Sequence, residues 1–324
     1  MAVTEFTTAS PERVQRWAAR VWAEMPRKIF WGKFMEESPE AIIEVKRDLE
    51  GVAGDTLTFS FSRKLRGAGA QNDDDLEDQE EELEYFSDSV TLIQRRNAVR
   101  LKGPLSMKRT AFDQKKDAKN HLKTWLAENI DDYIFTQFDT NPSTVIFGGT
   151  ATSTATLVVT DLITPTIFDK AVAKAKKADP KMWPITTSRG DRYVILLHTD
   201  SAYDLERNSE WNQTTRDAGI RGDENKIFTG AHGEWRGTVI HEHEKVPVSA
   251  TGGAAGNVPY ASNLFLGMQA GCFVWGKKPE AWEKEFQYGA APGFAIGAIW
   301  DFTKAVFDGA DHAAIFLRVA RTNT

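Results

Sequence analysis

Residues 73–84 of this 324-residue chain contain nine carboxylates, which cannot be buried together in a compact core. Like charges at that density repel one another and stay in solvent. Before the run, apolar and small polar residues alternate through residues 57–61, which is the period of a half-buried strand. After the run, residues 90–92 indicate a returning strand. We therefore predict that residues 55–102 form a hairpin-like excursion with an acidic tip.

Basic residues on the stem of this excursion leave two interpretations open. The acidic run is either a solvated loop or the tip of a projecting arm that contacts basic residues of another subunit. In the second case, charge complementarity would set register and encounter rate more than affinity. The candidate contact residues are Arg63, Lys64, Arg66, Asp73, Asp74, Asp75, Glu77, Asp78, Glu80, Glu81, Glu82, Glu84, Arg95 and Arg96.

Residues 1–50 are predicted to form an arm ahead of the excursion. Pro11 suits the first position of a helix, and Ser10 suits its cap. Apolar residues from Val14 to Trp22 follow at helical spacing, and Pro26 ends the run. This amphipathic helix packs either on its own domain or on a neighbouring subunit, and the sequence leaves both open.

The longest periodic element is a helix predicted over residues 106–138. Apolar side chains recur at three- and four-residue steps from Ala118 to Phe138, so they share one face. Thr110-Ala111-Phe112-Asp113 resembles a capping box, and Asn141-Pro142 ends the helix. From residue 110 onward this helix would run about 43 Å.

The remaining elements mix helix and strand, which predicts an α+β fold. A second helix runs from Thr164-Pro165 to about Ala178 and ends at Asp179-Pro180. A buried strand follows over residues 193–197, and Ser201 begins a further helix. Later strands are expected over residues 235–241, 286–302 and 313–319, with Asp308-Gly309 between the last two. Residues 143–161 receive no assignment.

One histidine pair is the strongest candidate for chemistry. On a strand, His241 and His243 would share a face and could hold a metal. The sequence fixes no third ligand, and the helical zinc-protease spacing is absent. A metal-binding enzyme that uses these two histidines therefore stays a weaker alternative.

The other candidate motifs do not form a catalytic set. The only cysteine, Cys272, lies among apolar residues, which favours a buried structural thiol. A single cysteine excludes an intramolecular disulfide and a multi-cysteine zinc site, and it fits a reducing cytoplasm. The glycine-rich segments 67–69 and 252–256 lack the context of a Walker or dinucleotide-binding loop. We expect no catalytic, metal-binding or cofactor-binding residue and no cofactor.

Charge and hydropathy narrow the class of partner. The net charge of −6 is unlike that of a protein that binds nucleic acid through phosphates. The sequence does not predict a signal peptide or a membrane span, so we expect no membrane partner.

A series of short motifs, in order along the chain, resembles a known family. They are similar to the major capsid proteins of tailed bacteriophages, typified by the gp56 capsid protein of phage N-four. The clearest motifs are Lys176-Lys177-Ala178-Asp179-Pro180, Tyr193-Val194-Ile195-Leu196-Leu197-His198, Ile227-Phe228-Thr229-Gly230-Ala231, Asn263-Leu264-Phe265-Leu266-Gly267 and Trp275-Gly276-Lys277. The likeness extends over most of residues 50–310.

The resemblance implies an HK97-like capsid fold and a division of the chain. The implied parts are an N-terminal arm (1–50), an extended loop (51–104), a peripheral domain with a long spine helix (105–160), an axial domain (161–285) and C-terminal strands that return to the peripheral domain (286–324).

The resemblance also implies the function. Copies of the chain would assemble as hexamers and pentamers into an icosahedral shell that encloses double-stranded DNA without sequence-specific binding. Assembly would take place in the bacterial host cytoplasm, and the protein would end in the virion capsid. Portal, scaffold and decoration proteins are the further partners that the resemblance allows. An encapsulin-like nanocompartment of the same fold and a monomeric binding protein are the alternatives.

Overall fold

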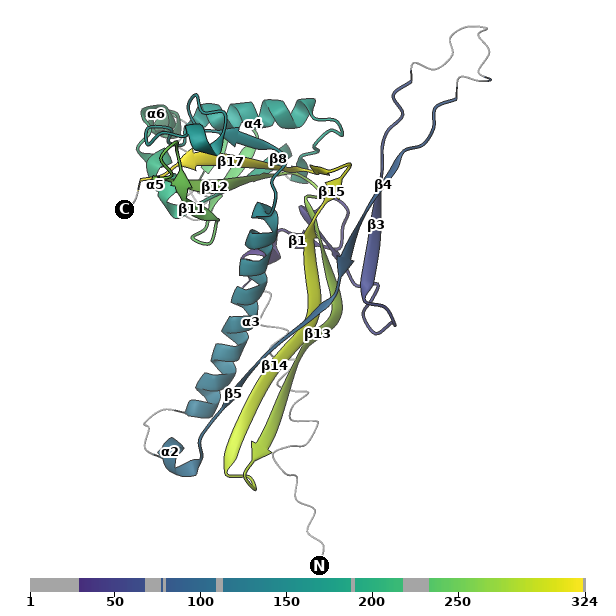
Figure 1. Cartoon of the computed structure of the whole chain (residues 1–324), viewed down its shortest axis with the longest axis vertical. Coiled ribbons are helices and arrows are strands. Elements are labelled where there is room, and N and C mark those ends of the chain that lie inside the picture. Colours follow the sequence, from purple (N-terminus) through teal and green to yellow (C-terminus); the bar gives the residue numbers. More distant parts are fainter. Residues whose placement is uncertain are drawn as a thin grey trace, which may run out of the picture. The chain divides into compact units, whose positions relative to one another are not determined.

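A computed structural model describes residues 29–67, 77, 80–108, 113–187, 190–217 and 233–322 (Figure 1). The chain forms two compact units. We call the first the spine unit; it takes in residues up to Leu57, Val90–Phe138 and Cys272–Thr303. We call the second the eight-stranded unit; it takes in Thr58–Ser89, Asp139–Gly271 and Lys304–Thr324.

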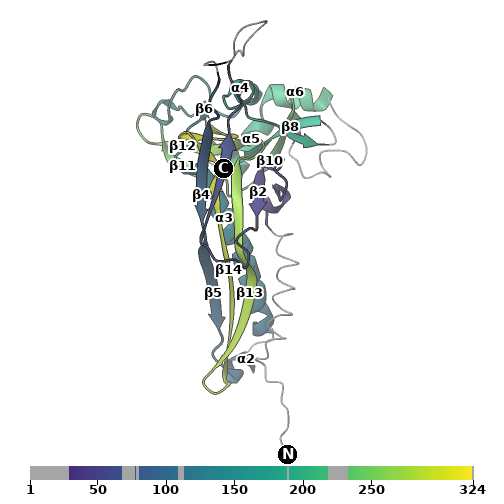
Figure 2. The same ribbon diagram turned by 90° about the vertical axis from the view of Figure 1, so that its right-hand side faces the viewer.

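The spine unit consists of one long helix, α3 (Gln114–Asp139), beside a five-stranded sheet (Figures 1 and 2). The strand order is β1 (Met35–Glu36), β2 (Ile43–Lys46), β13 (Gly271–Phe286), β14 (Ala291–Lys304) and β5 (Ile93–Arg100). Leu122, Leu126 and Ile130 of α3 are fully buried, as the spacing of its apolar residues predicts. The rings of Phe138 and Phe302 meet at 5.1 Å and join the helix to β14.

The long helix begins later than its sequence predicts. Residues Pro104–Lys108 form a separate short helix, α2, and α3 starts at Gln114. The Asp113 carboxylate accepts the backbone N–H groups of Lys115 and Lys116 at 3.0 and 3.3 Å, so Asp113 caps the helix. The prediction of one helix from residue 106 is therefore wrong at its start, and Thr110–Phe112 lie outside the described residues. Its 26 residues span about 39 Å.

Two strands predicted as continuous are interrupted by turns. The predicted strand 286–302 starts with a reversal, because Gln287, Tyr288 and Gly289 all have positive φ. The predicted strand 235–241 is present from Thr238 onward but is not continuous. It splits into β9 (Gly233–Trp235) and β10 (Thr238–Glu242), which pair antiparallel around Arg236 and Gly237 at φ 39° and 84°. Positive φ at both central residues is the geometry of a tight hairpin.

The second unit centres on an eight-stranded mixed sheet. Its main order is β6 (Val145–Phe147), β17 (Ala314–Ala320), β12 (Val258–Leu266), β8 (Gly190–Leu197), β10 and β9. β11 (Val248–Gly252) pairs with β12, and β7 (Ile185–Thr187) pairs with β8. The buried strand predicted at residues 193–197 is confirmed, because Ile195, Leu196 and Leu197 of β8 have no exposed area.

Helices α4 (Pro165–Lys177), α5 (Thr199–Glu206) and α6 (Ser209–Asp217) complete this unit. The helix predicted after Thr164 is confirmed, with Thr164 at its N-cap and Ile167, Phe168 and Ala171 buried. Among the described residues, every helix is too short or too polar to cross a membrane. Cys272 is buried, as predicted.

Two small hairpins complete the fold. β3 (Thr56–Ser62) pairs with β4 (Tyr85–Thr91), which confirms the stem of the predicted excursion. β15 (Val306–Phe307) pairs with β16 (Ala310–Asp311) around Asp308 and Gly309. Residues 68–76, 78 and 79, which include four of the nine carboxylates of the predicted acidic tip, lie outside the described residues.

Candidate assembly surfaces

Aromatic packing fixes the base of the β3–β4 hairpin within the eight-stranded unit. The ring of Phe61 stacks on that of Phe307 at 5.1 Å and lies 4.9 Å from the imidazole of His312. Phe59 meets the same Phe307 ring edge-on at 6.0 Å. The Asp88 carboxylate of β4 accepts the backbone N–H of Val306 at 3.1 Å. We call this contact between the β3–β4 and β15–β16 hairpins the hairpin base.

Acidification is expected to weaken the hairpin base through His312. Burial lowers the pKa of His312 below its usual 6.5. The neutral imidazole therefore contributes stability that is complete above pH 6.5 and is lost as the pH falls towards the lowered pKa. Thermal unfolding of the unassembled chain between pH 7.5 and 5 should show a larger loss in the wild type than in His312→Gln. Equal losses in the two proteins would contradict this role.

Above the base, oppositely charged side chains of the stem pair within the chain. The guanidinium of Arg63 lies 3.0 Å from the Glu84 carboxylate. The Glu81 carboxylate accepts the backbone N–H groups of Arg66 and Gly67, which lower its pKa. Arg63 and Arg66 both pair with Asp179, just beyond α4, and the hydrogen bond from Arg66 lowers the pKa of that carboxyl. We call this group the charged stem.

The predicted contact residues therefore fall into separate groups. Arg63, Arg66, Glu81 and Glu84 come together in the charged stem. Lys64 is exposed beside them. The other acidic residues that the structure describes are all exposed; they are Glu77, Glu80 and Glu82. The remaining four lie outside the described residues; they are Asp73, Asp74, Asp75 and Asp78.

Arg95 belongs to the interior of the spine unit. Its guanidinium lies against the rings of both Tyr133 and Trp300, at 4.2 and 4.0 Å from their centroids. It donates to the Trp300 carbonyl at 2.6 Å and to the Asp301 carboxylate at 3.1 Å. Burial first, and a hydrogen bond to Asp301 next, raise the pKa of Tyr133 to about 12. Arg95 thus has a structural role within its own chain.

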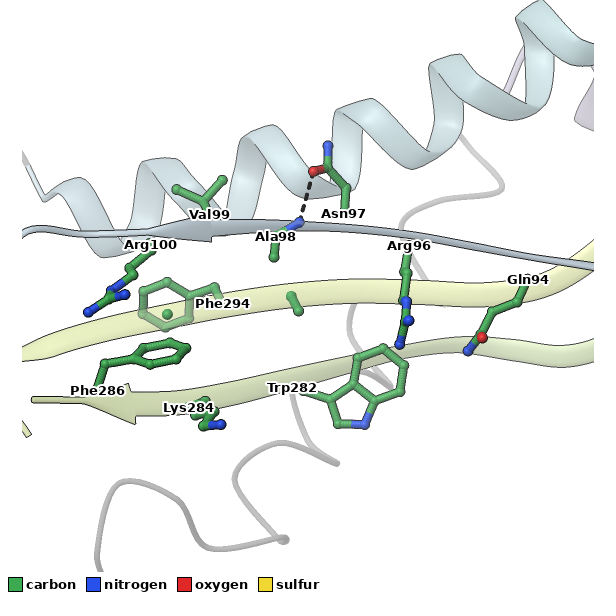
Figure 3. Close-up of a pocket in the computed structure, with 12 residues that line it drawn as sticks. Gln94, Arg96, Asn97, Ala98, Val99, Arg100, Trp282, Lys284, Phe286 and Phe294 are labelled. Carbon is green, nitrogen blue, oxygen red and sulfur yellow. Dashed lines mark hydrogen bonds between the residues drawn. The ribbon is translucent and has the colours of Figure 1, made fainter.

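Arg96 lines a groove that sequence reasoning missed (Figure 3). Successive residues of a strand point to opposite faces. Arg95 faces Tyr133 of α3, so Arg96 lies on the sheet face turned away from the helix. The groove has a volume of about 610 Å³. It is lined by Gln94, Arg96, Asn97, Ala98, Val99, Arg100, Trp282, Lys284, Phe286, Gly293, Phe294 and Ala295.

Aromatic rings and cations alternate along this groove. The Arg100 guanidinium lies 4.3 Å from the centroid of Phe286, and the Lys284 ammonium lies 5.2 Å from it. Glycines make room for the rings: a Cβ at Gly293 would come 2.8 Å from the Phe286 ring, and one at Gly297 would come 2.9 Å from that of Trp282. The sequence signal for this surface is the period-two spacing of Trp282, Lys284 and Phe286, which places the three side chains on one face of a strand. We call this surface the aromatic groove.

Among the residues that the structure describes, the histidine pair does not come together with further metal ligands. His241 lies on β10, and the Nδ1 of His243 accepts the backbone N–H of Lys245 at 3.1 Å. Within the described part of the chain, no three His, Cys, Asp or Glu residues are grouped so that they could hold a metal ion.

A family model described as phage capsid protein matches residues 5–145 and 136–311. The two matches together cover far more than half of the chain. The chain belongs to the phage capsid protein family. Its role in that family is structural, and capsid proteins of this kind make multimeric shells.

Relatives of this capsid protein match it over almost their whole length. It is 25% identical to the major capsid protein of Pseudomonas phage KPP25, over 94% of this chain and 92% of that protein. It superposes on the capsid of Ralstonia phage GP4 with a TM-score of 0.82 and 26% identity, over 99% of each chain. The predicted α+β, HK97-like capsid fold is confirmed.

An encapsulin shares the fold at greater distance. The SrpI encapsulin of Synechococcus elongatus gives a TM-score of 0.54 and 12% identity, over 100% of this chain and 92% of that chain. That likeness concerns the fold alone. The GP4 capsid is therefore more similar to this chain than the encapsulin is, in both sequence and structure.

Proposed function

We propose that this chain is the major capsid protein of a tailed phage and that copies of it form a closed icosahedral shell around double-stranded DNA. The observation that carries the proposal is the match to the KPP25 major capsid protein, which spans nearly both chains. We place the arm, extended loop, peripheral domain, axial domain and returning strands at 1–50, 51–104, 105–160, 161–285 and 286–324. We further propose that shells of hexamers and pentamers assemble in the host cytoplasm with portal, scaffold and decoration proteins as partners.

The β3–β4 hairpin supports assembly on physical grounds. An isolated two-stranded hairpin is marginally stable in water. Beyond its base this hairpin carries large apolar side chains in solvent, with Leu65, Leu83 and Tyr85 exposed by 58%, 53% and 64%. A neighbouring copy would cover them. Several such contacts, each weak, add avidity because they are linked.

The experiment that tests the proposed function is sedimentation velocity of the purified full-length chain, with negative-stain microscopy of the fastest fraction. We expect closed particles of uniform diameter that protect DNA from nuclease when they are isolated from an infected host. A stable 36 kDa subunit at every concentration would contradict the proposal. Particles that enclose a protein cargo instead of DNA would favour the nanocompartment alternative.

We also propose that the acidic run contacts basic residues of a neighbouring subunit. Glu81 and Glu84 already serve the charged stem, so the contact would use the other seven carboxylates of residues 73–84. Exposed ion pairs contribute roughly 0.2–1 kcal/mol each, so a group of them is needed for a clear effect. Among the predicted contact residues, Lys64 and Arg96 are the exposed cations that do not belong to the charged stem.

Neutralising those seven residues to Asn and Gln is expected to raise the protein concentration needed for assembly by roughly tenfold at low salt. The variant's assembly should also depend less on salt, because salt acts on assembly by screening exposed charges and the variant has fewer of them. Light scattering across a salt series measures both. The matched control is Glu81→Gln with Glu84→Gln, which alters the charged stem instead. Unchanged yield and unchanged salt sensitivity in the seven-residue variant would refute the contact.

A further inference from the structure

We propose that Tyr288, at the turn between β13 and β14, inserts into the aromatic groove of a second copy of this chain. The inference rests on the proposed function, because it requires self-assembly. It adds a contact that does not involve the acidic run.

The conformation of the β13–β14 turn holds the side chain of Tyr288 in solvent. Its side chain is 111% exposed, whereas no other exposed large apolar residue exceeds 65% among those that the structure describes. Gln287 and Tyr288 have φ of 54° and 53°, a conformation that L-residues with side chains rarely adopt. The N–H of Ala290 closes the turn on the Gln287 carbonyl at 3.2 Å. Positive φ at consecutive residues is the geometry of a tight hairpin turn.

The aromatic groove is built to receive a ring. The rings of Trp282 and Phe286 line it, and Arg96, Arg100 and Lys284 stand among them (Figure 3). The Arg100 guanidinium already lies over the face of the Phe286 ring at 4.3 Å. A second ring could therefore stack on the other side of the guanidinium. Tyrosine and arginine are also the residues most enriched where contacts between subunits matter most.

Charge makes the tip and the groove complementary. The groove lining contains three cations and no carboxylate. Residues 285–290 around the turn contain the carboxylate of Glu285 and no cation. Along β13, Glu283 pairs with Lys119 of α3, so Glu283 and Glu285 lie on the face opposite Trp282 and Lys284. When the β13–β14 turn enters the groove of another copy, it therefore brings the Glu285 carboxylate towards the three cations of that groove.

The acidic run is the competing occupant. It would also meet the three cations, but residues 73–84 contain no aromatic side chain. The distinctive features of the groove are its rings and the glycines that accommodate them, Gly293 and Gly297. A ring therefore fits this surface better than carboxylates alone.

Photo-crosslinking within assembled particles tests the contact directly. The full-length chain would carry p-benzoylphenylalanine in place of Tyr288, and unlabelled and ¹⁵N-labelled subunits would be mixed before assembly. We expect mixed-isotope crosslinks from position 288 to peptides that contain residues 94–100, 282–286 or 293–295. Crosslinks only within one isotope, only to other peptides, or none at all would overturn the proposal. Protection of Lys284 from acetylation without these crosslinks would assign the groove to another occupant.

Substitutions provide a second readout. Tyr288→Ala should raise the concentration needed for assembly at least tenfold, and Tyr288→Phe should change it by less than about twofold because the ring remains. The matched control is Tyr203→Ala on α5, which should leave assembly unchanged. Trp282→Ala should weaken assembly, and adding it to Tyr288→Ala should cause little further loss. Normal assembly of Tyr288→Ala would overturn this inference alone, whereas a wild type that forms no particles would overturn the proposed function.

Discussion

Replacing Trp31 with alanine is expected to destabilise the spine unit by about 3–5 kcal/mol. The indole has no exposed area, and its ring lies 4.9 Å from Phe135 and 5.2 Å from Phe138 of α3. The Asp131 carboxylate accepts the backbone N–H of Trp31 at 3.2 Å, so the segment is fixed to the helix at two points. Truncation would leave a cavity that the rigid helix cannot close.

Urea unfolding of the unassembled chain measures this loss. The matched control is Trp183→Ala, because Trp183 is 53% exposed in the other unit. The control should change the free energy of unfolding by no more than about 0.5–1 kcal/mol. If both variants lost the same stability, the assignment of Trp31 to the core would be wrong.

Replacing Arg95 with methionine is the substitution with the next largest expected effect, about 3 kcal/mol of unfolding free energy. Methionine retains much of the packing volume but loses the charge that lies against the Tyr133 and Trp300 rings. The Asp301 carboxylate, which is only 8% exposed, would lose its cation. An uncompensated charge in that setting is costly.

Its neighbour offers a matched control for the same measurement. Arg96→Met removes an exposed cation one residue away and should change stability by no more than about 0.5 kcal/mol. Adding Asp301→Asn to Arg95→Met should recover part of the loss, since the unpaired charge is then gone. A result in which Arg96→Met is the more damaging would reverse the roles assigned to the two arginines.

The sequence predicted the elements whose periodicity is undisturbed. The apolar face of α3, the helix after Thr164 and the alternation of β3 are all local signals, and the structure confirms them. The start of α3 was misplaced because Asp113, the last residue of the predicted capping box, is the residue that caps the helix. The turns at Arg236 and Tyr288 were missed because left-handed conformations at non-glycine residues leave no pattern in the sequence.

The assembly surfaces were only partly predictable. The charges of the stem were visible, but their common partner Asp179 lies 113 residues beyond Arg66 and comes near through the fold alone. Arg95 and Arg96 are equivalent in the sequence pattern. In the structure they lie on opposite faces of β5, with Arg95 against α3 and Arg96 in the aromatic groove. The groove requires the rings of β13, the glycines of β14 and the side chains of β5 at once, and only the sheet order supplies that combination.

The central claim is that copies of this chain bury surface by projecting segments onto one another. A cryo-electron microscopy reconstruction of the particles formed by the full-length chain measures this directly. The account predicts a closed shell in which residues 55–102 of each subunit contact a neighbouring subunit beyond the hairpin base. A shell in which those residues contact only their own chain, or a chain that forms no shell, would contradict it.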